Sequence, residues 1–190
     1  MKNKKEHLTK TGFQKIVNLR AALNTGELSK ELKAAFPKTK RVKRPLVENQ
    51  KIIDPQWLAG FSSAEGCFAI EISYSHKYKL GLNVKLKYQV SQHIRDEKLI
   101  KSLINYLKCG WCEVKTTKGE GICNLYVTKF SDIYEKIIPF FIKHPIVGVK
   151  SLDFADWCKA AEIIQTKTHL LKEGSDEIVK IKTAMNKGRY

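Results

Sequence analysis

The two ends of the chain repeat one segment, and this repeat constrains the fold more than any other feature of the sequence. Set against each other at an offset of 162 residues, 1–28 and 163–190 share 10 identities in 28 ungapped pairs, where average composition would give about one or two. The matches include His7 with His169 and Gly12 with Gly174. Since a repeated segment indicates a repeated structural unit, we expect the tail of one unit at the start and the tail of a second at the end.

The repeat divides the 190 residues into two expected parts. Residues 1–50 should hold the tail of a preceding unit and then a basic linker, whose densest run is Lys38-Thr39-Lys40-Arg41-Val42-Lys43-Arg44. Residues 51–190 should form a single domain, for which about 140 residues is an ordinary length.

The charge of the chain narrows the class of partner. Its 35 Lys and Arg exceed its 19 Asp and Glu by 16, and such an excess points to nucleic acid or an anionic membrane surface. A spanning helix needs about 20 apolar residues, whereas the longest comparable stretch, 137–142, is short and contains Pro139. The N-terminus has no apolar segment typical of a secretion signal. We therefore expect nucleic acid as the partner and no membrane.

The five cysteines follow no disulfide spacing, which favours free thiols in a reducing compartment. Cys109 and Cys112 form a CxxC pair that leads into a predicted strand. A redox pair should instead open a helix, and a zinc site should have a second ligand pair. We interpret the pair as structural.

The periodicity of residues 52–190 predicts an α+β unit. Asp54 and Pro55 are typical of a helix start, and this helix should end at Glu65. Alternating apolar positions predict strands near 68–75, 83–90, 111–116 and 122–127, with a helix after Asp96 and three more after the last strand. The order α-β-β-α-β-β-α-α-α predicts a four-stranded antiparallel sheet.

One face of the predicted strands is polar and basic. Alternation places on it Ala69, Glu71, Ser73, Ser75, Asn83, Lys85, Lys87, Gln89, Glu113, Lys115, Asn124 and Tyr126. Because a two-stranded ribbon fits the major groove, where Gln, Asn and Lys read base edges, we expect these residues to contact double-stranded DNA. The alternative is an ordinary solvent-exposed face. Lys77, Lys79 and the run 38–44 are expected to contact phosphates, which position the protein without specifying sequence.

The helix that precedes these strands carries a family resemblance. Leu58-Ala59-Gly60-Phe61-Ser62-Ser63-Ala64-Glu65-Gly66 resembles the motif that names the LAGLIDADG homing endonucleases, with Phe61-Ser62-Ser63 in place of the usual Leu-Ile-Asp. The elements after it and the basic strand face are similar to that family's unit. The chain resembles the C-terminal half of a two-motif enzyme of fungal organellar introns. This implies a single-motif LAGLIDADG-type α-β-β-α-β-β-α unit with a saddle-shaped four-stranded antiparallel sheet, and a mitochondrial location.

The resemblance also implies a catalytic site. Glu65 and the backbone carbonyl of Ala64 would bind Mg²⁺, a hard cation that takes oxygen ligands and that polarises a phosphoryl group. Gln92 would organise a water, and Lys150 would stabilise charge. Each has an ordinary alternative, as a surface carboxylate, amide or lysine. For Glu65 the alternative is weaker, because a carboxylate at a helix C-terminus is disfavoured by the helix dipole.

One motif supplies one catalytic carboxylate, whereas cutting both DNA strands requires two. In the family two motif helices pack side by side, and Leu58, Ala59, Gly60 and Ser63 are expected at that interface. We therefore expect a homodimer or a complementary half-enzyme, acting as a site-specific double-stranded DNA endonuclease of the intron homing type. The alternative is a non-cleaving nucleic-acid-binding protein, such as an intron RNA maturase or an inactive half-enzyme. A basic structural RNA-binding protein fits the charge but not the motif.

Overall fold

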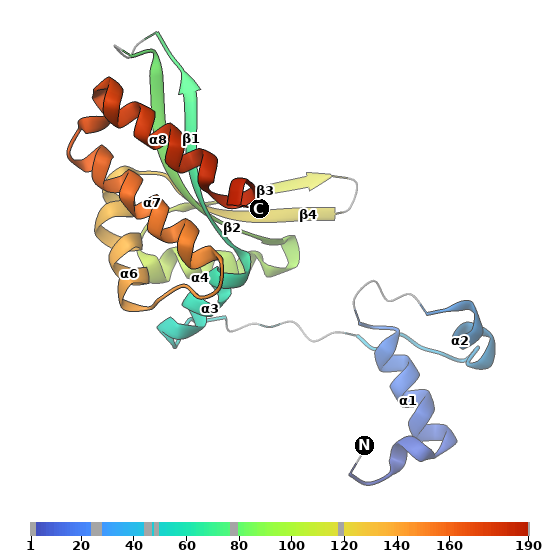
Figure 1. Cartoon of the computed structure of the whole chain (residues 1–190). Coiled ribbons are helices and arrows are strands. Elements are labelled where there is room, and N and C mark those ends of the chain that lie inside the picture. The colour runs from blue at the N-terminus through green and yellow to red at the C-terminus, as the bar shows by residue number, and fades with distance from the viewer. Residues whose placement is uncertain are drawn as a thin grey trace. The chain divides into compact units, whose positions relative to one another are not determined.

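The computed structural model describes residues 3–23, 28–43, 47, 50–76, 80–117 and 120–189. They form two compact units, Met1–Asn49 and Gln50–Tyr190 (Figure 1). The residues outside this description include Lys77, Lys79, Arg44 and residues 118–119, which lie between the third and fourth predicted strands. Within the described part of the chain, no helix has both the length and the apolar character needed to cross a bilayer.

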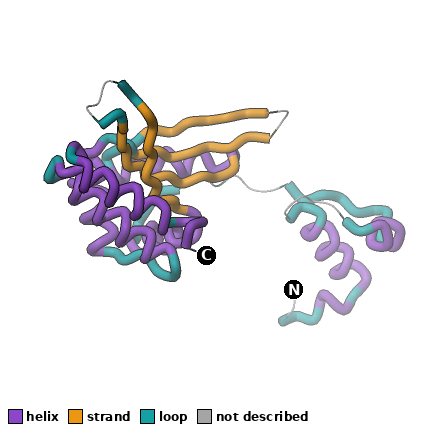
Figure 2. The backbone as a smooth tube through the Cα atoms, turned by 45° about the horizontal axis from the view of Figure 1, so that its top comes forward, coloured by secondary structure: helices purple, strands orange, loops and turns teal. Residues whose placement is uncertain are grey.

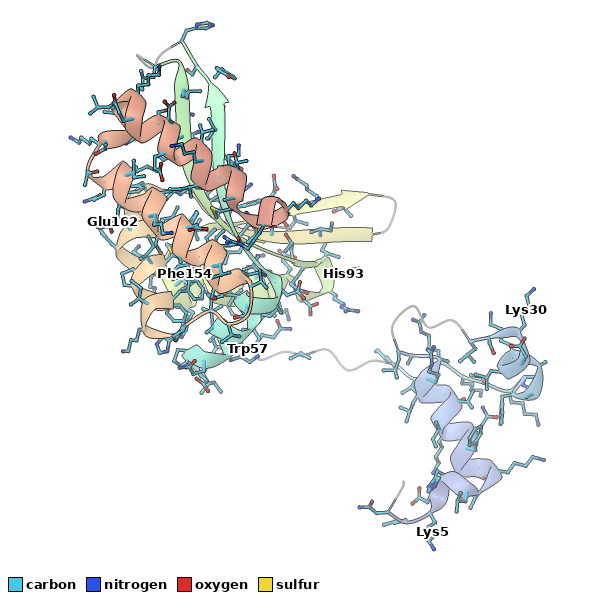
Figure 3. The ribbon with its side chains drawn as sticks, viewed as in Figure 1. Lys5, Lys30, Trp57, His93, Phe154 and Glu162 are labelled. Atoms are coloured by element: carbon cyan, nitrogen blue, oxygen red, sulfur yellow. The ribbon has the colours of Figure 1, made fainter. Side chains whose placement is uncertain are left out.

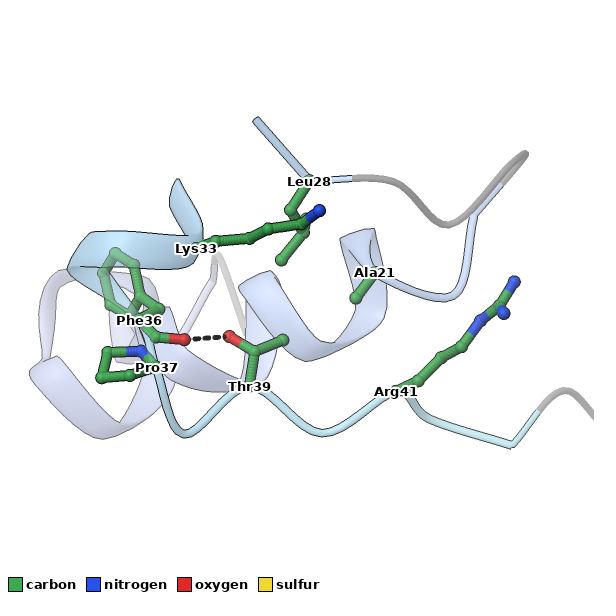
Figure 4. Close-up of a pocket in the computed structure, with 7 residues that line it drawn as sticks. All are labelled: Ala21, Leu28, Lys33, Phe36, Pro37, Thr39 and Arg41. Carbon is green, nitrogen blue, oxygen red and sulfur yellow. Dashed lines mark hydrogen bonds between the residues drawn. The ribbon is translucent and has the colours of Figure 1, made fainter. Parts of the chain in front are cut away.

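The first unit is a pair of helices joined by a small apolar cluster. A short 3-10 helix, η1 (Glu6–Leu8), leads into α1 (Lys10–Arg20), and α2 (Lys30–Ala35) follows. Val17, Ala21 and Leu28 are buried against Leu32 and Phe36 of the α2 segment. A pocket of about 240 Å³ lies beside this cluster, where the Thr39 hydroxyl donates to the Phe36 carbonyl at 2.7 Å (Figure 4). It is smaller than most ligand sites.

The second unit has the predicted α+β order. Its elements are α3 (Pro55–Glu65), β1 (Gly66–Tyr74), β2 (Leu82–His93), η2 (Ile94–Asp96), α4 (Glu97–Leu107), β3 (Trp111–Thr117), β4 (Glu120–Val127), α5 (Phe130–Asp132), η3 (Ile133–Ile137), α6 (Ile138–Lys143), α7 (Lys150–Gln165), η4 (Thr168–Leu170), α8 (Lys172–Ala184) and η5 (Asn186–Arg189). The first helical stretch after the last strand runs from Phe130 to Lys143 and passes through a π-helical turn, η3, just before Pro139.

The sheet is antiparallel throughout, with the strand order β1-β2-β4-β3. Leu86 pairs with Ile70, and Gln89 pairs with both Cys67 and Tyr126. Figure 2 shows the helices of this unit gathered against the sheet on one side, with strands extending beyond them. The predicted four-stranded antiparallel sheet is confirmed.

An aromatic cluster forms the core between the sheet and the helices. The ring of Phe68 lies 5.4 Å from Tyr88, 5.6 Å from Phe141 and 5.2 Å from Trp157, between centroids, and all four residues are buried. The indole nitrogen of Trp157 donates to the Ala69 carbonyl at 3.0 Å. This bond ties α7 to the backbone of β1, which is an edge strand of the sheet.

The repeated segments have the same backbone in both units. Lys5 and Lys167 both adopt a left-handed backbone conformation, with φ of 54° and 60°, and each residue directly precedes a 3-10 helix. A Cβ on Gly12 would lie 1.8 Å from the Glu6 carbonyl oxygen, and one on Gly174 would lie 2.3 Å from that of Thr168. These contacts explain why glycine stands at both positions, because any side chain would collide with the backbone.

Helix α3 buries one face in its own unit and exposes the other. Leu58 and Ala59 are only 0% and 2% exposed, so the prediction that they face a partner is wrong. The Ser62 hydroxyl is also buried and lies 2.7 Å from the Tyr88 hydroxyl. The exposed face instead carries Trp57, Gly60 and Ala64, because the core lies on the side where Leu58 and Ser62 recur at helical spacing.

Two substitutions on this helix should therefore act in opposite directions on stability. Leu58→Ala leaves a cavity in the core and should lower the free energy of unfolding by about 2–5 kcal/mol. Gly60→Ala meets nothing within 4 Å and should raise it by up to about 1 kcal/mol, because alanine is the better helix former. Urea denaturation of the two variants checks this, and equal effects would contradict the assignment of faces.

Candidate active site and nucleic-acid interface

The end of α3 presents a carboxylate to solvent. Glu65 is the last residue of the helix and is exposed. Gly66 starts β1 at once, and its backbone N–H donates to the Ser62 carbonyl. A Cβ on Gly66 would lie 2.6 Å from that carbonyl oxygen, so glycine permits the direct passage from helix to strand. This tight junction fixes where Glu65 leaves the backbone.

A lysine from α7 reaches the same helix end. Lys150 is the first residue of α7, and its ammonium donates to the Ala64 carbonyl at 2.9 Å and to the Ser62 carbonyl at 3.4 Å. Burial lowers the pKa of Lys150, while Cys67, Glu65 and Asp153 oppose this shift through their charges. The structure thus brings together three of the predicted groups, the Glu65 carboxylate, the Ala64 carbonyl and the Lys150 ammonium.

Gln92 lies near this junction but on a different face of the sheet from the other predicted strand residues. β1 begins with Gly66 opposite Val90, and Gln92 follows two residues later, opposite Cys123. Alternation along β2 puts Gln92 on the side of the buried Tyr88 and Val90, and it is half-buried itself. Its role in organising water stays a prediction.

The donor atoms at the end of α3 fit half of a divalent metal site. The Glu65 carboxylate and the Ala64 carbonyl supply neighbouring oxygen ligands, the type that Mg²⁺ and Ca²⁺ prefer. The carbonyl oxygen has a second lone pair beside the one that Lys150 engages. Among the described residues, no group of three or more His, Cys, Asp or Glu side chains could hold a metal ion. Water molecules and phosphate oxygens commonly complete the coordination of Mg²⁺ in proteins.

The strand register places the predicted polar residues on one face of the sheet. Across β1 and β2 the pairs are Ala69 with Lys87, Glu71 with Lys85 and Ser73 with Asn83; across β4 and β3 they are Tyr126 with Trp111, Asn124 with Glu113 and Ile122 with Lys115. Lys87 forms an ion pair with Glu71, and Lys115 with Glu113 at 3.0 Å. The Gln89 amide donates to the Ser91 hydroxyl at 2.9 Å.

Exposure on this face differs from the sequence expectation at three positions. Asn124 is only 5% exposed, whereas the other described residues predicted on this face are half-buried or exposed. Trp111 and Ile122 are 48% and 53% exposed and lie on the same face, although they were not among the predicted contacts. Alternation along the strands indicates this, because Trp111 is two residues from Glu113 and Ile122 is two residues from Asn124. Figure 3 labels His93, at the end of β2, and Trp57 on α3.

The cysteines are all free, as expected. Burial raises the pKa values of Cys109, Cys123 and Cys158 to about 11 each. Their thiols are therefore protonated at neutral pH, and a thiolate is the form that attacks disulfides and binds metals. This agrees with a structural interpretation of the CxxC pair.

Comparison with known proteins gives a consistent result. Residues 58–161 match the model of the LAGLIDADG endonuclease family. "Probable intron-encoded endonuclease 3" of Neurospora crassa is 36% identical over 177 residues, which are 93% of this chain and 32% of that protein. The I-SmaMI homing endonuclease bound to cleaved DNA is 49% identical, with a TM-score of 0.92 over 99% of this chain and 62% of its own. I-SmaMI bound to uncleaved target DNA with calcium ions has a TM-score of 0.91.

The chain spans about a third of the length of the Neurospora relative and less than two thirds of the I-SmaMI chain. The family match nevertheless covers more than half of this chain and includes most of α3, the whole sheet and most of α7. The family resemblance and the fold class predicted from the motif are confirmed. The chain belongs to the LAGLIDADG endonuclease family.

Proposed function

We propose that this chain supplies one half of a site-specific double-stranded DNA endonuclease of the intron homing type. The observation that carries the proposal is the meeting of the Glu65 carboxylate, the Ala64 carbonyl and the Lys150 ammonium at the end of α3. The intron-encoded endonuclease name of the Neurospora relative and the DNA in the I-SmaMI structures support it. By the same resemblance we propose a mitochondrial location.

The residues at the end of α3 have distinct proposed roles in hydrolysis. Glu65 and the Ala64 carbonyl would hold a divalent metal ion, which we propose to be Mg²⁺. When bound, such an ion polarises the phosphoryl group and lowers the pKa of a water. Lys150 would offset the negative charge that builds up on the phosphate in the transition state, and Gln92 would orient the attacking water.

The polar face of the sheet is proposed to lie in the major groove. Its amides and lysines match the hydrogen-bonding groups of base edges. Lys87 and Lys115 are already paired with Glu71 and Glu113, whereas Lys85 lies exposed on the same face. We expect the paired lysines to be held in place for contact with DNA, and the linker residues 38–43 to contact phosphates.

The exposed face of α3 is the proposed contact for a second LAGLIDADG unit. Nothing lies within 4 Å of a Cβ built on Gly60, so a second helix has room to approach the backbone closely. The stacked rings of Trp57 and Phe61, 4.9 Å apart, border this position. The second unit would come from another copy of this chain or from a complementary half, and it would bring the second carboxylate that cutting two strands requires.

Replacing the carboxylate should separate DNA cleavage from DNA binding. Glu65→Gln keeps the size of the exposed side chain but removes the charge that holds the metal, so cleavage should fall below detection while affinity stays within about threefold of wild type. The assay is cleavage of duplexes selected from a randomised library, in Mg²⁺ and in EDTA. A Glu65→Gln variant that cuts as fast as wild type would contradict the proposal.

Lys150 should affect the rate of DNA cleavage more than the affinity for DNA. Lys150→Met removes the ammonium near the scissile phosphate and should lower the cleavage rate about 10²- to 10³-fold. Lys159→Met is the matched control. Lys159 lies on the same helix, but its ammonium pairs with Asp156 of that helix, whereas Lys150 reaches the end of α3. Single-turnover cleavage of the same selected duplex compares the two. Equal cleavage rates for the two variants would contradict the proposed catalytic role of Lys150.

A large side chain on the exposed face of α3 should block association without unfolding the unit. Gly60→Leu fills the space that a second helix needs, and leucine is a good helix former, so the melting temperature should be kept. Sedimentation velocity with DNA present should show the two-unit complex lost in Gly60→Leu and largely kept in Gly60→Ala. Unchanged association of the leucine variant would show that the units meet elsewhere.

A further inference from the structure

The 3-10 helix η5, which follows α8, returns to the first turn of α7. It contains Asn186 and Arg189, and both residues donate to Asp153, which lies three residues after Lys150. The Asn186 backbone N–H and the Arg189 Nε reach the same carboxylate oxygen, Oδ1, at 2.9 Å and 3.0 Å. The Nη2 of Arg189 also donates to Oδ2 of Asp156 at 2.7 Å. Asp153 is only 7% exposed, so these donors compensate a carboxylate that has lost most of its contact with water.

Asn186 also reaches the start of the sheet. Its side-chain amide donates to the Phe68 carbonyl at 3.2 Å, and Phe68 is the third residue of β1. The Asn186 backbone is left-handed, with φ of 54°, a conformation that asparagine adopts more readily than most residues. Asn186 therefore bonds to α7 through its backbone and to β1 through its side chain. The hydrogen bonds that Asn186 and Arg189 donate to α7 and β1 are together named the η5 clamp.

α7 and β1 are the two elements that carry the groups of the candidate site. Lys150 is the first residue of α7, and Glu65 directly precedes β1. At the start of α7 the N-cap residue is Val149, whose apolar side chain cannot accept from the first N–H groups of the helix. The position of this first turn therefore depends on contacts with the rest of the unit, and the η5 clamp acts on the turn at Asp153.

We propose that the η5 clamp positions Lys150 for catalysis by holding the first turn of α7 against the start of β1. Asn186 and Arg189 are then positioning residues, which act through α7 and need no contact with DNA. The contact that they maintain is the 2.9 Å hydrogen bond from the Lys150 ammonium to the Ala64 carbonyl. This role deepens the proposed function and rests on it, because it takes the catalytic role of Lys150 from there.

Chemical labelling of Lys150 tests the clamp without DNA, metal or cleavage. The folded full chain is treated with N-hydroxysuccinimide acetate, and mass spectrometry gives the acetylation rate of each lysine. Arg189→Met removes the bonds to both carboxylates and should raise the rate at Lys150 about threefold or more, because the ammonium leaves the Ala64 carbonyl more often. Tyr134→Phe is the matched control. It removes the bonds from the Tyr134 hydroxyl to the Glu162 carboxylate, at 3.0 Å and 3.2 Å, near the other end of α7 (Figure 3), and should leave the rate at Lys150 unchanged.

Single-turnover cleavage of the selected duplex gives the second readout. Arg189→Met should lower the cleavage rate about tenfold, since small displacements of a reacting group cost rate steeply, while affinity for DNA stays within about threefold of wild type. Asn186→Gly keeps the left-handed backbone, which glycine adopts freely, and removes only the amide donor, so it should act in the same direction with a smaller effect. Arg189→Lys keeps the charge but lacks the forked guanidinium, and its rate should fall between those of wild type and Arg189→Met.

Circular dichroism and thermal melting give the temperature range in which each variant is folded, and both readouts are taken within it. If Arg189→Met does not fold, Asn186→Gly and Arg189→Lys carry the same test. Three outcomes would overturn the proposed role of the clamp: equal labelling of Lys150 in Arg189→Met and wild type, an equal increase in Tyr134→Phe, or faster labelling without slower cleavage. A wild-type chain that protects Lys150 through the clamp but cuts no duplex would overturn the proposed function and leave the clamp in place.

Discussion

The site depends on how firmly one face of α3 is held in the core of its own unit. Leu58 is fully buried, and the Ser62 hydroxyl meets the buried Tyr88 hydroxyl of β2 at 2.7 Å. These contacts fix both the position and the rotation of the helix against the sheet. Because Gly66 enters β1 directly, the rotation of α3 also determines where the Glu65 carboxylate emerges, and Lys150 then reaches the carbonyl of the preceding residue.

The same anchoring leaves the opposite face of α3 exposed, and this is the face on which the proposed second motif helix would pack. An apolar core on one side and the open backbone at Gly60 on the other give the helix two different packing surfaces. The Glu65 carboxylate lies at the end of that open face, so a second motif helix packed there would bring its own acid close by.

Much of the fold could be predicted because its signals are local. Strand parity placed Lys85, Lys87 and Gln89 on one face, and the cap at Asp54 placed the start of α3, where the Asp54 carboxylate accepts from the Gln56 backbone N–H at 2.8 Å. The faces of α3 were harder, because a helix of small residues has apolar atoms all round. Only the position of the core shows that Leu58 and Ala59 point inward. Likewise, the contact of Lys150 with Ala64 joins residues 86 apart in sequence, which no local pattern encodes; its expected role came from the family resemblance.

We infer that two LAGLIDADG units are needed for each double-strand cut. The decisive measurement is native mass spectrometry of the protein–DNA complex assembled in Ca²⁺, followed by addition of Mg²⁺ to start cleavage. We expect two units on each duplex, either two copies of this chain or one copy with a complementary half, and no double-strand cleavage from complexes of lower mass. A single copy of the chain that binds its duplex alone and cuts both strands would contradict it.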